Sequence, residues 1–117
     1  NSTQNNAILN EIMPVNQALL NPALAASLGV TEGDRVRIWS RVGSIEIGVH
    51  LTETLRPDSI MVAHGFGHRS RLLTKAGERG VRDGDPIPDQ SAAEAARVGN
   101  FGGSSCIMDA VVNIEKI

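Results

Sequence analysis

The sequence predicts a single domain that is mainly β with short helices. Its 117 residues suffice for one hydrophobic core and are too few for two. Charged and apolar residues alternate in several short runs, which is the period of a β-strand. The core must be aliphatic, because the chain has one Trp, two Phe and no Tyr. Small aliphatic cores suit tight β-barrels, whose interior space is limited.

The composition argues against several classes of protein. Lys and Arg total 11 against 13 Asp and Glu, a net charge of -2, and with few aromatic rings this argues against nucleic-acid binding. No apolar run approaches the roughly 18 residues of a membrane span, so we expect no direct membrane contact. Cys106 is the one cysteine, which excludes an internal disulfide and a Cys-rich metal site held by this chain alone.

The first elements follow from local signals. We expect a helical turn over residues 7–13 and a short strand over 15–20. Asn21 is a favoured N-cap and Pro22 suits the first helical position, so a helix is predicted to begin there and to end at Gly29. Alternation over residues 35–40 and 45–51, joined by a turn at 42–44, predicts a hairpin.

The second half is predicted to hold more loops. Residues 59–63 form a nearly continuous apolar run, which predicts a strand buried on both faces. A glycine-rich loop follows at 64–69, and we expect the basic stretch 71–82 to be partly helical. A capping box at 91–94 predicts a short helix, and alternation over 108–117 predicts a final strand.

The stretch from His64 to Arg82 is the strongest candidate for binding an anion. It holds five cations and one acid, a net charge of +4, with four glycines that let a ligand approach the backbone. Arginines and backbone amides together suit a phosphate or pyrophosphate. The competing interpretation is a solvated loop whose charge is balanced by acids downstream, namely Asp83, Asp85, Asp89 and Glu94.

Three further patterns allow more than one interpretation. His64 and His68 have zinc-like spacing, but the glycines between them oppose a helix, so hydrogen bonding in the loop is favoured. The polar run 3–6 suits the edge of a polar heterocycle, or is a frayed terminus. The Gly103-Ser104 step would suit a self-processing pyruvoyl decarboxylase, although such a cleaved bond is expected near the amino terminus.

Taken together, the motifs resemble a known family over nearly the whole chain. They are Asn21-Pro22-Ala23, residues 26–30 and 33–36, Gly43, Thr52, Leu55-Arg56-Pro57, residues 64–68 and residues 111–115. In order and spacing they resemble the C-terminal molybdopterin dinucleotide-binding domain of the molybdopterin oxidoreductase (dimethyl sulfoxide reductase) family. Within it, residues 3–6, 9–11 and 64–68 are most similar to thiosulfate and polysulfide reductase catalytic subunits, with tetrathionate and arsenate reductases as close relatives.

The resemblance implies a fold and a set of site residues. The fold is a double-psi β-barrel of the aspartate decarboxylase type, formed by residues 1–117 as one domain. The implied cofactor-binding residues are Thr3, Gln4, Asn5, Asn6, His64, Gly65, Phe66, Gly67, His68, Arg69 and Asn100. This chain reads Asp83-Gly84 where the family often has Asn, and residues 100–103 replace its usual Asp-Pro-x-Ser-Gly stretch.

The resemblance also implies a cofactor and partners. The cofactor is a bis-(molybdopterin guanine dinucleotide) carrying molybdenum, with tungsten as the alternative, and the parent enzyme also carries an iron–sulfur cluster. The implied partners are the other domains of the larger catalytic subunit that contains this chain, a membrane anchor and an iron–sulfur electron-transfer subunit. The implied location is the periplasm or the outer face of the cytoplasmic membrane.

We expect no catalytic residue and no metal ligand in this chain, and no activity from it alone. The alternative is a stand-alone binding module on the same barrel.

Overall fold

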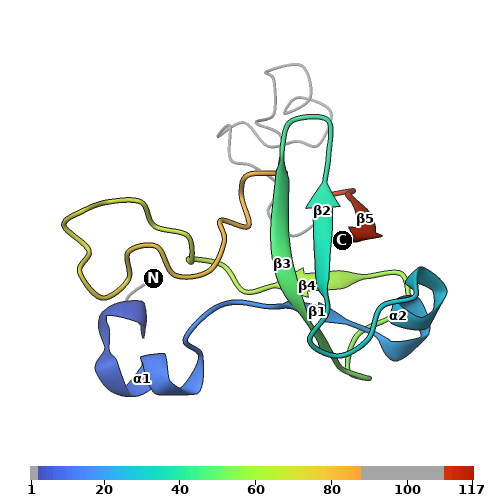
Figure 1. Ribbon diagram of the computed structural model, residues 1–117, viewed down its shortest axis with the longest axis horizontal. Coiled ribbons are helices and arrows are strands. Elements are labelled where there is room, and N and C mark those ends of the chain that lie inside the picture. The colour runs from blue at the N-terminus through green and yellow to red at the C-terminus, as the bar shows by residue number, and fades with distance from the viewer. Residues whose placement is uncertain (1–2, 88–109) are drawn as a thin grey trace, which may run out of the picture.

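The computed structural model describes residues 3–87 and 110–117 of the chain (Figure 1). Short strands dominate, with few helical turns between them, as the sequence predicted. The elements in chain order are η1 (Thr3–Asn5), α1 (Ala7–Ile12), β1 (Ala18–Leu20), α2 (Pro22–Leu28), β2 (Arg35–Trp39), β3 (Ser44–Leu51), β4 (Ile60–Val62) and β5 (Asn113–Lys116). In these described ranges, no helix has the length and apolar character needed to cross a membrane.

Five strands form one sheet in the order β4-β1-β3-β2-β5. The predicted hairpin is present, with β2 antiparallel to β3 and Val36 opposite Ile47. β1 lies parallel to the far end of β3, and β4 and β5 are antiparallel to β1 and β2. In Figure 1, β1 and β4 cross the direction of β2 and β3 steeply, so the sheet curls around its inner face.

The core is aliphatic, as the composition predicted. Side chains of β2 and β3 alternate between buried and exposed, which turns Val36, Ile38 and Ile47 inward. Trp39 is 40% exposed and contributes little to this core. The buried cluster consists of Ala18, Leu20, Ala25, Val30, Val36, Ile38, Ile45, Ile47 and Val49.

Helix α2 begins and ends where the sequence predicted. The Asn21 side chain accepts a hydrogen bond from Ala23 N at 2.8 Å, and its amide nitrogen donates to Leu55 O at 2.7 Å. Gly29 ends the helix in the left-handed region at φ 65°. The N-cap therefore also fastens α2 to the turn that precedes β4.

Two predictions about the second half were wrong. Residues 59–63 were expected to be buried on both faces, but β4 is an edge strand and Met61 is 52% exposed. Apolar content alone cannot distinguish a central strand from an edge strand with one face exposed to solvent.

The capping box at 91–94 and the Gly103-Ser104 step lie outside the described residues.

The other wrong prediction concerns residues 71–82, which form successive turns and no helix. Gly77 N donates to Leu73 O at 2.7 Å, which closes one helical turn. The next amide, Glu78 N, donates to His68 O at 2.8 Å, and Gly67 N donates to Arg79 O at 2.8 Å. Bonds across the loop therefore replace the bonds that would have continued a helix.

Strand β5 is fastened to the loop before β2 by one carboxylate. Lys116 Nζ lies 2.6 Å from Asp34 Oδ2, and the backbone and hydroxyl of Thr31 donate to the same oxygen at 2.9 Å. These contacts, with Lys116 the largest, lower the pKa of Asp34 from 3.8 to about 2. The negative charge of Asp34 therefore stabilises the folded state.

We predict that Asp34→Asn lowers the free energy of unfolding at neutral pH. Because the pKa of Asp34 is lower in the folded than in the unfolded chain, its contribution is complete above about pH 4 and is lost as the pH falls through about 2. The difference between wild type and variant should narrow over that interval, as measured by urea denaturation at a series of pH values. A difference that stays constant from pH 7 to pH 2 would contradict this account.

Candidate functional site

The two loops that the sequence singled out meet in the structure. Gln4 is 2% exposed, and its Nε2 donates a hydrogen bond to the carbonyl oxygen of Gly65. This contact joins the amino-terminal turn η1 to the glycine-rich loop that follows β4. One surface thus holds segments that are 61 residues apart in the chain.

The same side chain has an acceptor with no partner among the described residues. Gln4 Oε1 is buried and accepts no hydrogen bond. A buried acceptor without a donor costs about 1–3 kcal/mol, so such atoms in folded proteins call for an explanation. A ligand that brings an N–H group to this position would remove that cost.

The other residues of the polar run take different roles. Asn6 is the N-cap of α1, where its Oδ1 accepts from Ile8 N at 3.0 Å and from Leu9 N at 3.5 Å. Asn10 Nδ2 donates to Gln4 O at 2.6 Å and so braces the turn. Asn5 is exposed, and Thr3 begins η1. The side chain of Gln4 is therefore the one in this run seen to reach the glycine-rich loop.

The glycine-rich loop itself is held by local contacts. His64 Nδ1 lies 2.9 Å from Asp83 Oδ2, and the imidazole remains 63% exposed. Phe66 is buried, and the His68 carbonyl accepts from Glu78 N. Within residues 3–87 and 110–117, no group of three His, Cys, Asp or Glu side chains could hold a metal ion. Asn100 lies outside the described residues.

Asn16 organises this region, and the sequence analysis did not identify it. The residue is 3% exposed. Its Nδ2 donates to Ala63 O at 3.1 Å and to Val81 O at 2.9 Å, and its Oδ1 accepts from Val81 N at 2.9 Å. One amide therefore joins the segment before β1, the start of the glycine-rich loop and the segment at 81. Nothing in the sequence distinguishes Asn16 from the other asparagines of the chain.

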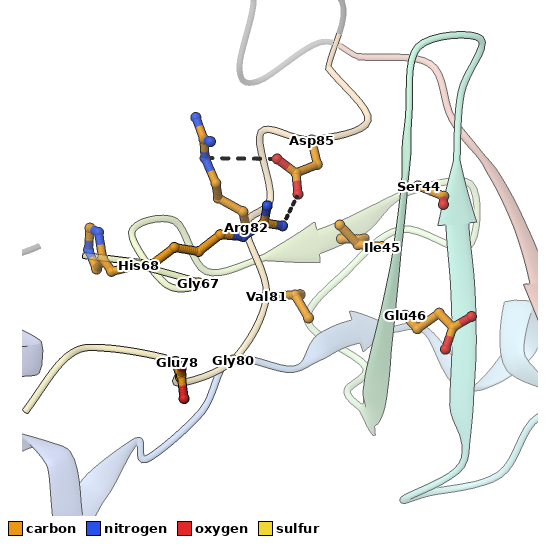
Figure 2. A pocket seen from close by; sticks show the side chains of 11 residues that line it. Ser44, Ile45, Glu46, Gly67, His68, Glu78, Gly80, Val81, Arg82 and Asp85 are labelled. Carbon is orange, nitrogen blue, oxygen red and sulfur yellow. Dashed lines mark ion pairs between the residues drawn. The ribbon is translucent and has the colours of Figure 1, made fainter. Parts of the chain in front are cut away.

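A cavity of about 500 Å³ opens beside this junction (Figure 2). Its walls are the start of β3, the second half of the glycine-rich loop and the segment that returns toward the hairpin. Three of the predicted residues line it, Gly67, His68 and Arg69, whereas residues 3–6 do not. The remaining lining residues are Ser44, Ile45, Glu46, Glu78, Gly80, Val81, Arg82 and Asp85.

Charges of both signs line the cavity. Arg69 and Arg82 approach the two oxygens of Asp85 at 3.7 and 3.8 Å, so two guanidinium groups share one carboxylate (Figure 2). Glu46 instead pairs with Arg37 at 3.0 Å across the hairpin. Asp85 therefore balances basic residues of the loop, which was the alternative interpretation of the sequence. Two guanidinium groups nevertheless offer more N–H donors than this one carboxylate can accept.

Glycines permit the close packing that forms this cavity. Gly67 has φ 74°, and a Cβ there would lie 2.5 Å from Arg82 N and 2.7 Å from the Val81 carbonyl carbon. At Gly80, with φ 65°, a Cβ would lie 2.3 Å from Asn16 Oδ1. The described residues thus present guanidinium and imidazole groups, an orphan acceptor and glycines in close backbone contact. This set fits a polar heterocycle joined to a phosphate group.

Comparison with known proteins gives the family. The family described as "Molydopterin dinucleotide binding domain" matches residues 1–95. The chain therefore belongs to the molybdopterin dinucleotide-binding domains, as its sequence resemblance predicted. This membership confirms the predicted class of cofactor, a molybdopterin dinucleotide.

Three curated relatives are similar to this chain. The molybdopterin-containing ArrA subunit of the arsenate respiratory reductase of Chrysiogenes arsenatis is 34% identical over 106 residues, which are 83% of this chain and 12% of that protein. A tetrathionate reductase subunit of Salmonella typhimurium strain LT2 is 34% identical over 68% of this chain and 8% of its own length. The molybdopterin-containing PhsA subunit of the thiosulfate reductase of the same organism is 29% identical over 74% of this chain and 12% of its own length.

A solved structure has a similar fold. Acetylene hydratase from Pelobacter acetylenicus matches 73% of this chain and 12% of its own chain, with a TM-score of 0.59 and 21% identity. The chain spans about a tenth of the length of each of these proteins.

We predict that Gly67→Ala is far more costly than Gly84→Ala. The first places a Cβ against the backbone of residues 81 and 82 and forces a positive φ on Ala, a conformation that by itself costs about 1–3 kcal/mol. At Gly84 a Cβ would meet nothing within 4 Å. Chemical denaturation of both variants measures the difference, and equal losses of stability would contradict the close packing.

Proposed function

We propose that this chain binds and orients the bis-(molybdopterin guanine dinucleotide) cofactor of a larger molybdenum oxidoreductase, with tungsten as the alternative metal. The observation that carries this proposal is the contact of Gln4 with Gly65. It unites the two loops that sequence resemblance assigns to the cofactor, and it leaves a buried acceptor beside them. Family membership supplies the class of ligand.

The proposal includes closure of the curled sheet into a double-psi β-barrel. An aliphatic core, five short strands in one curled sheet and the fold similarity to acetylene hydratase support it. In such a barrel, loops at one end of the strands converge. The loops at 3–6 and 64–69 would then face the cofactor together.

We further propose an inorganic sulfur compound as the substrate of the parent enzyme, thiosulfate or polysulfide before tetrathionate or arsenate. The names of two curated relatives, a tetrathionate and a thiosulfate reductase subunit, support a sulfur compound, and a third names arsenate, the alternative that contains no sulfur. The parent would work at the periplasmic or outer face of the membrane, and its partners would be a membrane anchor and an iron–sulfur subunit. The bound cofactor would supply the metal at which two electrons pass to the substrate.

In this proposal the chain's own residues hold the cofactor and take no part in the chemistry. Gln4 would accept a hydrogen bond from the pterin through Oε1, while its Nε2 remains on Gly65. His68 and Arg69 would donate to polar oxygens from the cavity wall. Asn6 and Asn10 would act indirectly, because both stabilise the turn that presents Gln4.

We predict that titration of this chain with a pterin dinucleotide shifts backbone amide resonances at residues 3–6 and 64–69. The two loops already form one surface, so both sets should move together and with one affinity. Asn5→Ala, which removes an exposed amide next to Gln4, should weaken binding, whereas the control Gln17→Ala, also exposed, should not. Saturating ligand with no localised shifts would contradict the proposal and favour a stand-alone binding module.

A further inference from the structure

Helix α1 and the residues that follow it expose a cluster of large apolar side chains. None of the six residues of the helix is buried, and Ile8 and Ile12 are 72% and 77% exposed. The other exposed members of the cluster are Leu9, Met13 and Val15. Single apolar side chains are ordinary at a protein surface, whereas a contiguous group marks a place where the protein contacts something else.

Helix geometry places four of these side chains on one side of α1. Positions three and four apart share a face. We call this side the α1 face, and it consists of Ile8, Leu9, Ile12 and Met13. Asn10 lies on the opposite side, where its Nδ2 donates to Gln4 O at 2.6 Å. The polar side of the helix therefore turns toward η1 and the α1 face turns away from it.

The described chain offers this face no apolar surface to pack against. Figure 1 shows α1 to one side of the sheet, well separated from its strands. Isolated helices shorter than about 12–15 residues are marginal in water, and most helices in proteins are stabilised by packing of an apolar face. The N-cap Asn6 and the brace at Asn10 are polar contacts that remove little apolar surface from water. A stable α1 therefore needs a partner outside the described residues.

The length of the relatives indicates where this partner lies. The chain spans 12%, 8% and 12% of the three curated relatives, so most of such a protein lies outside it. A membrane surface is disfavoured, because residues 1–34 contain no Lys or Arg, the side chains with which amphipathic helices bind anionic headgroups. An uncharged apolar face instead fits a second apolar protein surface, as at the centre of an interface.

We propose that the α1 face docks against an apolar surface in the remaining part of the same polypeptide in the parent enzyme. The inference rests on the proposed function, because it requires this chain to be part of a larger subunit. It goes beyond that function, since it assigns a protein contact to a face that has no role there. Asn10 joins α1 to Gln4, and Gln4 contacts Gly65, so docking also holds the two loops in place.

The test compares the 117-residue chain with the full parent subunit by hydrogen exchange. The amides of Asn10 and Met13 report on the helix, because both donate hydrogen bonds within its turns. These amides should exchange about 100-fold more slowly in the parent, since the helix then opens only when buried apolar side chains are exposed.

A double variant, Ile8→Ala with Ile12→Ala, tests the α1 face itself. Alanine removes most of the apolar surface and retains a high helix propensity. The variant should abolish the slow exchange in the parent and leave the thermal midpoint of the 117-residue chain unchanged, because both side chains are exposed there. The control Val42→Ala, at an exposed apolar residue of the hairpin turn, should change neither measurement.

Other outcomes overturn the proposal in distinguishable ways. A 117-residue chain that sediments as a dimer, which the double variant dissociates, identifies a second copy as the partner. Binding of the wild-type chain, but not the double variant, to vesicles of anionic phospholipid identifies a membrane. A parent that carries molybdopterin dinucleotide but leaves α1 unprotected refutes the docking of the α1 face alone. A parent that protects α1 without carrying the cofactor refutes the proposed function alone.

Discussion

The side-chain amide of Asn16 is the interaction on which the functional region depends. It pairs with both backbone groups of Val81 and with the carbonyl of Ala63, so it replaces a strand pairing at a point where the sheet has ended. Gly80 lies against it where a Cβ would not fit. Because Ala63 directly precedes the glycine-rich loop and Val81 directly precedes Arg82, this one buried side chain helps to position two of the three walls of the cavity.

Most of the asparagine side chains described here hydrogen-bond to the backbone of the loops and helix ends, so they stabilise the site and are not free to bind a ligand. Asn6 caps α1, Asn10 braces the turn at Gln4, Asn21 caps α2, and Asn16 joins three segments. These contacts hold the loops in place without a ligand, which lowers the ordering cost of binding. The buried acceptor of Gln4 is the exception. It lacks a hydrogen-bond donor among the described residues, which costs folding free energy, and it lies at a position assigned here to a ligand.

Features that depend on residues close together in the chain were predicted correctly. The two ends of α2 were predicted to the residue from Asn21, Pro22 and Gly29, and the β2–β3 hairpin was predicted from the alternation of charged and apolar residues. The edge position of β4 and the turns at 71–82 depend on which backbone groups meet across the fold, so periodicity could not reveal them. The meeting of Gln4 and Gly65 was anticipated only through family resemblance. Asn16 belongs to no recognisable sequence motif, since its role arises from buried contacts that exist only in the folded chain.

The most direct test of this account is hydrogen exchange in Asn16→Ala, with Gln17→Ala, a change at the exposed neighbouring residue, as the control. Loss of the Asn16 amide leaves three backbone groups without partners, at about 1–3 kcal/mol each if they stay buried. The account predicts faster exchange throughout residues 63–68 and 79–82, with the β2–β3 hairpin still protected, and no such change in the control. Unchanged protection of those two segments in Asn16→Ala would show that the loops are held by other contacts and would contradict the account.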